Sequence, residues 1–85
     1  MSKAIFKYTL EFDKKQQIEL PLDAEILSAQ MQNEKICLWA KVSNTLTKRK
    51  KDVYIYGTGT CIQEDDLSYV GTVQDGIYVW HIFIK

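Results

Sequence analysis

The end of the chain, residues 71–84, places the strongest limit on its fold. Asp75-Gly76 separates two runs of β-branched and aromatic residues. This dipeptide is typical of a type I′ hairpin turn, which needs positive φ at both central residues. Side chains of the second run would alternate between two apolar faces: Tyr78, Trp80, Ile82 and Ile84 on one, and Ile77, Val79, His81 and Phe83 on the other. Such a strand must be covered on both faces, by its own fold or by another chain.

The small size of the chain limits how far its own residues can cover both faces of this last strand. Its 85 residues form one domain, residues 1–85, and 46% of them are apolar. A domain of this size buries only roughly 60–65% of its unfolded surface. We therefore expect a homo-oligomer whose interface completes the core. The expected interface residues are Val79, Trp80, His81 and Phe83.

Alternating patterns elsewhere predict about seven short strands and an all-β fold, either a small antiparallel β-barrel or a β-sandwich. In the first strand Phe6, Tyr8, Leu10 and Phe12 share one face. A hairpin turn at residues 13–16 would lead to a return strand that ends at Pro21, because proline cannot donate to a ladder. Residues 43–51 are expected to be a polar, basic loop, and residues 52–56 a strand.

Residues 24–42 predict a hairpin with its turn at Asn33-Glu34. In this register the facing pairs on one side are all apolar, and a slip by one residue would mix polar with apolar partners. The pairs are Met31 with Ile36, Ala29 with Leu38 and Leu27 with Ala40, and on the other face Gln32 with Lys35, Gln30 with Cys37, Ser28 with Trp39 and Ile26 with Lys41. A helix capped by Asp23 is the alternative for residues 23–32, and we prefer the strand.

Charge and cysteine content narrow the class of protein. Eleven cationic and eleven anionic side chains give no global signature for binding nucleic acid or an anionic membrane. Cys37 and Cys61 fit neither a metal-binding spacing nor a disulfide framework. A strand pattern directly follows the N-terminus, and no apolar run approaches the length of a membrane span. These features predict a reduced, cytoplasmic protein with no metal and no cofactor.

One group of residues suggests a ligand with phosphates and a base. The basic run Lys48, Arg49 and Lys50 precedes Tyr54 and Tyr56, which share a face of one strand. Cations suit phosphates, and aromatic faces suit a stacked base. Trp39 lies on an otherwise polar face of its hairpin and is added to this candidate site, although a second sheet or a partner chain could equally cover it. A solvated basic turn beside ordinary strand tyrosines is the simpler interpretation.

Two other features were weighed for chemistry. Gly57-Thr58-Gly59-Thr60 could present backbone amides to an anion, but it matches no phosphate-binding motif and a β-bulge explains it better. His81 could act as a base for a cysteine nucleophile, with a carboxylate from residues 64–66 orienting it. No nucleophile motif accompanies it, so a histidine packed in a sheet or an interface is the preferred interpretation. We expect a protein that is not an enzyme.

Seven short segments, spread over nearly the whole chain, form a recognisable set. They are Ile5-Phe6-Lys7-Tyr8, Ile18-Glu19-Leu20-Pro21, Ala24-Glu25-Ile26-Leu27, Cys37-Leu38-Trp39-Ala40, Tyr56-Gly57-Thr58-Gly59, Tyr69-Val70-Gly71-Thr72-Val73 and Val79-Trp80-His81-Ile82-Phe83. In this order and spacing they resemble a family of short phage and prophage proteins classed as a domain of unknown function. The resemblance implies a phage setting and a bacterial host cytoplasm, and it implies no catalytic residues.

These observations lead to an expected function in binding. The first hypothesis is a phage counter-defence protein that sequesters an anionic nucleotide-type immune signal in an oligomeric pocket. The alternatives are an inhibitor that binds a host protein through the Trp39 or Trp80 face, and an accessory protein of the virion or its assembly. A single-stranded nucleic-acid binder ranks below these, because the net charge is zero.

Overall fold

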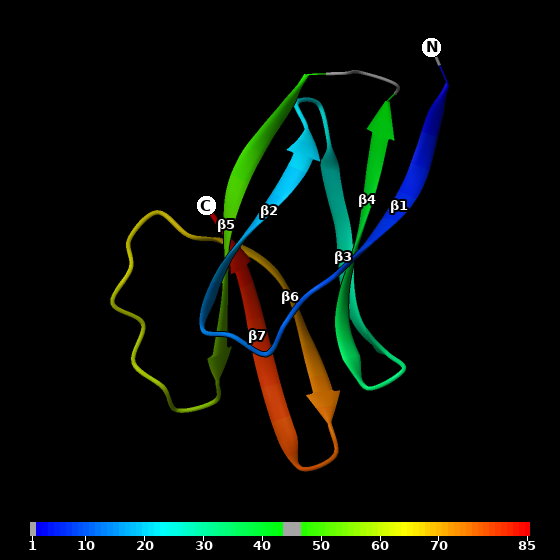
Figure 1. Cartoon of the computed structure of the whole chain (residues 1–85). Helices are drawn as coiled ribbons and strands as arrows, with labels where there is room; N and C mark the ends of the chain where they lie inside the picture. Colours follow the sequence, from blue (N-terminus) through cyan, green and yellow to red (C-terminus); the bar gives the residue numbers. More distant parts are fainter. Residues whose placement is uncertain (1, 44–46) are drawn as a thin grey trace.

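The chain folds into two antiparallel β-sheets that face each other, as seen in the computed structural model (Figure 1). The structure describes residues 2–43 and 47–85. One sheet has three strands in the order β1-β4-β3, and the other has four in the order β2-β5-β7-β6. The seven strands are β1 (Lys3–Thr9), β2 (Lys15–Pro21), β3 (Glu25–Gln32), β4 (Lys35–Ser43), β5 (Lys48–Gly57), β6 (Ser68–Asp75) and β7 (Tyr78–Ile84). The prediction of seven strands is confirmed, and of the two architectures expected the sandwich is the one observed.

The two sheets meet along one side and separate along the other. Where β3 lies beside β6, a Cβ atom added to Gly71 would stand 3.3 Å from the Cβ of Ala29. On the opposite side β1 and β2 are the outermost strands of their sheets and do not pair with each other. Alternate residues of β2 to β7, together with Leu10, which follows β1, fill the space between the sheets. The core residues are Leu10, Leu20, Ala29, Ile36, Leu38, Val53, Ile55, Val73, Ile82 and Ile84.

The β3–β4 hairpin confirms the predicted turn, strand assignment and most of the register. Asn33 and Glu34 both have positive φ, 52° and 64°, as a type I′ turn requires. The predicted pairs hold from Gln32–Lys35 to Ser28–Trp39. Beyond them the prediction is wrong, because a bulge between Ile26 and Ser28 sets Ile26, not Leu27, opposite Ala40. The extra residue, Leu27, is exposed, as expected where a bulge lets one residue leave the alternation.

The closing hairpin differs from the prediction by one position. Asp75 pairs with Tyr78, so the turn residues are Gly76 and Ile77 rather than Asp75 and Gly76. Of these two only Gly76 has positive φ, 61°, which is the pattern of a type II′ turn with glycine first. The predicted alternation of β7 is confirmed, because Ile82 and Ile84 point into the core while His81 and Phe83 lie opposite Tyr56 and Tyr54 on the outer face.

The expected hairpin at residues 13–16 is wrong. β1 pairs with β4 and β2 pairs with β5, so this connection carries the chain from one sheet to the other. Leu10 stays with β4, since its N–H donates to the carbonyl of Ile36 at 2.8 Å. The Gln16 side chain then bonds both the N–H and the carbonyl of Glu11. These bonds give backbone groups of the crossing segment hydrogen-bond partners, in place of the strand pairing that a hairpin would supply.

The basic run also differs from its prediction as a loop. Residues 48–51 form the first half of β5, while residues 44–46 of the expected loop lie outside the described part of the chain. β2 supplies the ladder: Glu19 faces Lys50, and Leu20 faces Arg49. Long lysine and arginine side chains keep their charged ends in water while their stems lie along a strand, so a polar composition did not prevent strand pairing.

A hydrogen bond ties the turn after β2 to the end of β4. The buried hydroxyl of Ser43 donates to the carboxylate of Asp23. This bond is the main cause that lowers the pKa of Asp23 below its ordinary value of 3.8. A carboxyl whose pKa is lower in the folded state stabilises the fold once it is ionised.

Replacing Gly71 by valine should destabilise the fold. Valine favours strands, but its Cβ would stand 3.3 Å from the Cβ of Ala29 and 3.6 Å from its backbone nitrogen, which belongs to the facing sheet. We expect a loss of about 1–3 kcal/mol in the free energy of unfolding, measured by urea denaturation. Ser68→Val, at an exposed position of the same strand, should change it by less than about 0.5 kcal/mol. Equal stability of Gly71→Val and wild type would contradict the close contact.

Ser43→Ala should lower stability in a pH-dependent way. The folded-state pKa of Asp23 is depressed, so its stabilisation is complete above its ordinary value of 3.8 and is lost as pH falls through the lower folded value. The difference in unfolding free energy between wild type and Ser43→Ala should therefore be largest at pH 5–7 and shrink below about pH 3.8. Urea melts across this range measure it, with Ser68→Ala as a control whose difference should not depend on pH. If the difference in unfolding free energy between wild type and Ser43→Ala does not change with pH, the proposed link to ionisation of Asp23 is wrong.

Candidate functional site

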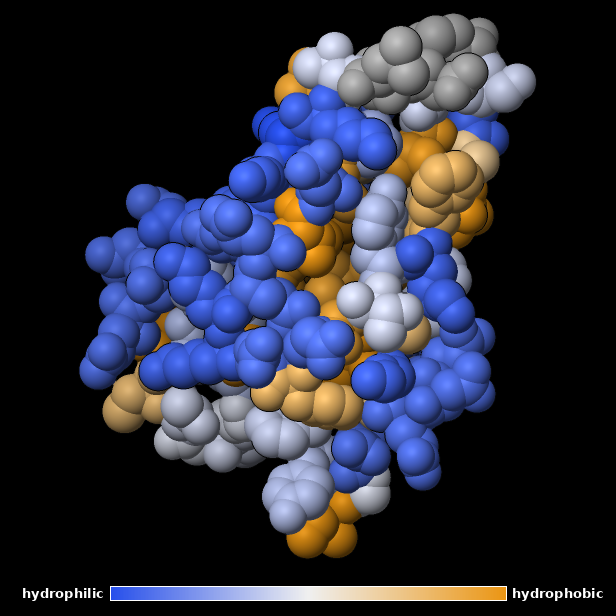
Figure 2. Space-filling model, viewed as in Figure 1, coloured by the Kyte–Doolittle hydropathy of each residue, from blue (hydrophilic) through white to orange (hydrophobic). Residues whose placement is uncertain are grey.

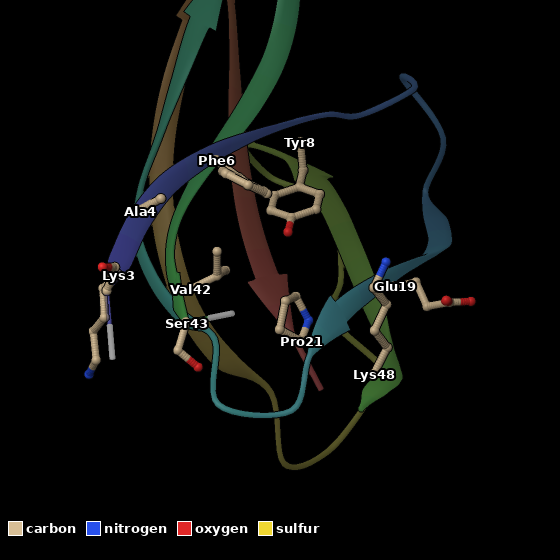
Figure 3. Close-up of a pocket in the computed structure, with 10 residues that line it drawn as sticks. Lys3, Ala4, Phe6, Tyr8, Glu19, Pro21, Val42, Ser43 and Lys48 are labelled. Carbon is tan, nitrogen blue, oxygen red and sulfur yellow. The ribbon is translucent and has the colours of Figure 1, made fainter. Parts of the chain in front are cut away.

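A cavity lies on the open side of the sandwich, between the edges of β1 and β2 (Figure 3). Its volume is about 570 Å³. Figure 2 shows the apolar side chains that remain visible in the hollow between these strands. The cavity is lined by Ser2, Lys3, Ala4, Phe6, Tyr8, Glu19, Pro21, Val42, Ser43 and Lys48. We call it the inter-sheet pocket.

The wall of the inter-sheet pocket is mainly aromatic and aliphatic. Phe6 and Tyr8 come from the same face of β1, Val42 lies beside them on the neighbouring strand β4, and Pro21 of β2 stands across the pocket (Figure 3). The Phe6 side chain remains 54% exposed, so a large ring at this edge is only half covered by its own chain. Such a ring has room for a further contact.

The polar groups of the pocket include two lysines and one glutamate, Lys3, Lys48 and Glu19. Their formal charges sum to +1 at neutral pH. Tyr8 carries its hydroxyl into the space above Pro21 (Figure 3), and burial raises the pKa of this phenol. The hydroxyl is therefore protonated at neutral pH and available as a donor. An apolar wall with a few polar groups at its rim is the usual character of a small-molecule site.

The residues predicted to bind a ligand do not meet in one place. Lys48 lines the inter-sheet pocket. Tyr54 and Tyr56 are buried on the outer face of β5, and Trp39 lies in the other sheet opposite Lys7 and Ser28. Arg49 and Lys50 are exposed along β5, facing β2.

The two tyrosines form a separate outer-face cluster. Their rings are stacked, with centroids 6.3 Å apart and planes 5° apart. The cation beside them is Lys15 of β2, whose Nζ lies 5.6 Å from the Tyr54 centroid, rather than the basic run. They line a cavity of about 180 Å³ together with Gln63 and Glu64 of the long segment between β5 and β6. Burial is the main cause that raises the pKa of Tyr56.

The predicted interface residues of β7 divide between its two faces. Trp80 lies on the inner face, stacked with Tyr78 at 5.8 Å and tilted against Phe12 at 6.2 Å. Its indole N–H is buried and has no hydrogen-bond partner. Phe83 lies on the outer face between Tyr56 and Tyr69, with centroids 5.9 and 5.6 Å away. Aromatic rings of the chain itself therefore cover part of the outer face of β7.

His81 lies in a row of hydroxyl groups on the same outer face. Its Nε2 is 2.8 Å from the Thr58 hydroxyl and its Nδ1 is 3.1 Å from that of Thr72. The Thr72 oxygen is also 2.5 Å from the Tyr69 hydroxyl. Both ring nitrogens thus have neutral hydroxyl partners, and within residues 2–43 and 47–85 no carboxylate bonds to the ring. This arrangement holds the end of β5 against β7 and β6. Val79, the fourth predicted residue, is half-buried.

Sequence reasoning missed most of the inter-sheet pocket. The shared face of Phe6 and Tyr8 was visible as an alternation, but that pattern is the same for a central strand and for an edge strand. Their position beside an open gap follows from the pairing of β1 with β4 alone. Among residues 2–43 and 47–85 no group of three or more His, Cys, Asp or Glu side chains is placed to hold a metal ion. The described part of the chain also contains no helix suited to crossing a membrane.

No curated protein and no solved structure matches the chain. A family match does exist and extends from residue 1 to residue 85. It includes all seven strands of the described part of the chain, the inter-sheet pocket and the outer-face cluster. Because the match spans the whole chain, the protein belongs to the family described as a domain of unknown function, DUF7352.

Proposed function

We propose that this domain is a binding protein that sequesters a small anionic ligand with a planar ring in the inter-sheet pocket. The observation that carries the proposal is the pocket itself, about 570 Å³ in volume and lined by Phe6, Tyr8 and two lysines. Small-molecule sites are typically about 300–1,000 Å³, mostly apolar, with a few polar groups that fix orientation.

The lining suggests how such a ligand would lie. Phe6 and Tyr8 offer aromatic faces for a planar base, because base–aromatic stacking contributes about 1–3 kcal/mol per base. Lys48, at the rim, would take the phosphate through a charge-assisted hydrogen bond, whereas the Lys3 side chain points away from Phe6 and Tyr8 (Figure 3). The Tyr8 hydroxyl would donate to an acceptor on the ring. A nucleotide has all three of these features, and it is the ligand class that we propose.

The biological setting is part of the same proposal. A phage protein that removes a nucleotide-type immune signal from the cytoplasm of a bacterial host needs tight binding and no turnover. A pocket made of aromatic and cationic side chains suits that task. The resemblance of the sequence to short phage proteins supports this setting.

A protein partner is the second candidate, and one observation favours it. The tip of the β6–β7 hairpin carries Ile77, which is 89% exposed, beside Tyr78, which is 58% exposed. Neighbouring large apolar side chains exposed at one place are typical of a protein-binding surface. An inhibitor of a host protein would use this tip, and Ile77→Asp would abolish its capture of that protein while leaving nucleotide binding unchanged.

Calorimetric titration with a panel of mononucleotides and cyclic dinucleotides tests the first proposal. We expect at least one to bind, and Phe6→Ala to weaken it about 5- to 150-fold through lost stacking, which corresponds to about 1–3 kcal/mol. Lys48→Ala should weaken it by a similar factor, through loss of a charge-assisted hydrogen bond. Lys50→Ala is the matched control, since it removes a neighbouring cation of β5 that does not line the pocket.

Two results would contradict the assignment of the pocket. One is the absence of binding by every nucleotide in the panel. The other is unchanged affinity in both Phe6→Ala and Lys48→Ala. Native mass spectrometry of protein purified from bacterial cells, which detects a bound small molecule by its mass, provides an independent check.

A further inference from the structure

β1 is an edge strand, paired on one side only, with large apolar side chains in solvent. It has one neighbour, β4, and every one of its residues except Tyr8 is exposed. Ile5 is 60% exposed and Phe6 54%, and adjacent residues of a strand point to opposite faces. An edge of this kind is a template for pairing with another strand. We propose that β1 pairs with β1 of a second copy of this chain, antiparallel about a twofold axis at Phe6.

The hydrogen bond of Leu10 shows which backbone groups of β1 are free. The N–H of Leu10 donates to the carbonyl of Ile36, and the β1–β4 register continues from this pair without a shift. In an antiparallel ladder, residues that bond to a given neighbour alternate with residues that do not. Ala4, Phe6 and Tyr8 therefore direct their backbone groups to β4. The odd-numbered residues, Lys3, Ile5, Lys7 and Thr9, direct theirs to the open edge.

The length of β1 and its charges together favour one symmetric register. With the axis at Phe6, Ile5 faces Lys7 of the partner subunit and Lys3 faces Thr9 of the partner subunit. All of Lys3–Thr9 is paired, and no two like charges face each other. An axis at Ile5 would set Lys3 against the partner's Lys7, and an axis at Lys7 would set that lysine against itself. Like charges directly opposite destabilise a strand pair.

On the open side of the sandwich, the edge of the four-stranded sheet, β2, is less suited to this contact. β2 carries Lys15, Gln17 and Glu19, which are all exposed, and ends at Pro21. Charged side chains and proline are features that protect an edge against pairing. A second copy is therefore expected at β1 rather than at β2.

This pairing would also complete the inter-sheet pocket. In the Phe6-centred register the two Phe6 residues form a non-hydrogen-bonded pair, with Cα atoms about 4.5 Å apart and side chains in contact. Phe6 lines the pocket from its open side, so the partner's Phe6 would extend that wall. In a single copy of the chain the pocket therefore lacks the wall that the partner's Phe6 would add. The role of this wall in binding rests on the proposed function, whereas the dimer contact does not.

Analytical ultracentrifugation of the full chain without added ligand tests the contact. We expect a species of twice the 9.9 kDa chain mass, and a shift to the single-chain mass in Phe6→Glu, because two carboxylates would face each other at the axis. Phe6→Lys should likewise be a monomer, and an equal mixture of Phe6→Glu and Phe6→Lys should restore the dimer. Monomeric wild type up to 1 mM would overturn the proposal, and so would variants that remain dimeric or a mixture that remains monomeric.

A backbone variant keeps the test decisive if the Phe6 variants fail to fold. Ile5→Pro removes an N–H that points to the open edge and leaves the bonds to β4, and edge strands tolerate proline. It should be monomeric, with the far-ultraviolet circular dichroism of the wild type. Ile5→Val, which keeps the N–H, should remain a dimer, and a dimeric Ile5→Pro would overturn the proposal. A dimer that binds no nucleotide would contradict the proposed function alone, and a monomer that binds one would contradict only the dimer.

Discussion

The close approach of β3 and β6 is the constraint on which the rest of the structure depends. Gly71 has no side chain, so the backbone of its strand can come within contact distance of Ala29 in the facing sheet. A side chain of ordinary size would push the sheets apart, because interiors are packed without spare room. The contact closes the sandwich on one side only. The gap between β1 and β2 on the other side is what remains, and the inter-sheet pocket occupies it.

Sequence patterns predicted the strands better than their partners. The β3–β4 hairpin was predictable because its turn and its two faces agree, and only one register keeps apolar residues together. The bulge at Leu27 was not, since one extra residue leaves the same composition in the strand. β1 and β2 alternate equally well whether they pair with each other or with β4 and β5. A partner far along the chain is chosen by packing of the whole domain, which a local pattern does not contain.

The residues of the candidate site were also easier to identify one by one than to place next to each other. Lys48 was identified from charge, and it lies in the inter-sheet pocket. Tyr54 and Tyr56 were grouped with the basic run because they are near it in sequence, but they lie on an outer face where Lys15 is their neighbouring cation. Phe6, Tyr8, Pro21 and Val42 come from three different strands. Their meeting depends on topology, so no spacing in the sequence marks them.

The hydroxyl row around His81 has a consequence for the choice of imidazole tautomer. A hydroxyl donates or accepts according to how it rotates, and each ring nitrogen has such a partner, Thr58 or Thr72. A neutral imidazole needs an acceptor at the nitrogen that carries the proton and a donor at the other nitrogen. Rotation of the two threonine hydroxyls meets this need in either tautomer without moving the backbone. The hydrogen bonds that join the end of β5 to the β6–β7 pair can therefore keep their geometry whichever ring nitrogen carries the proton.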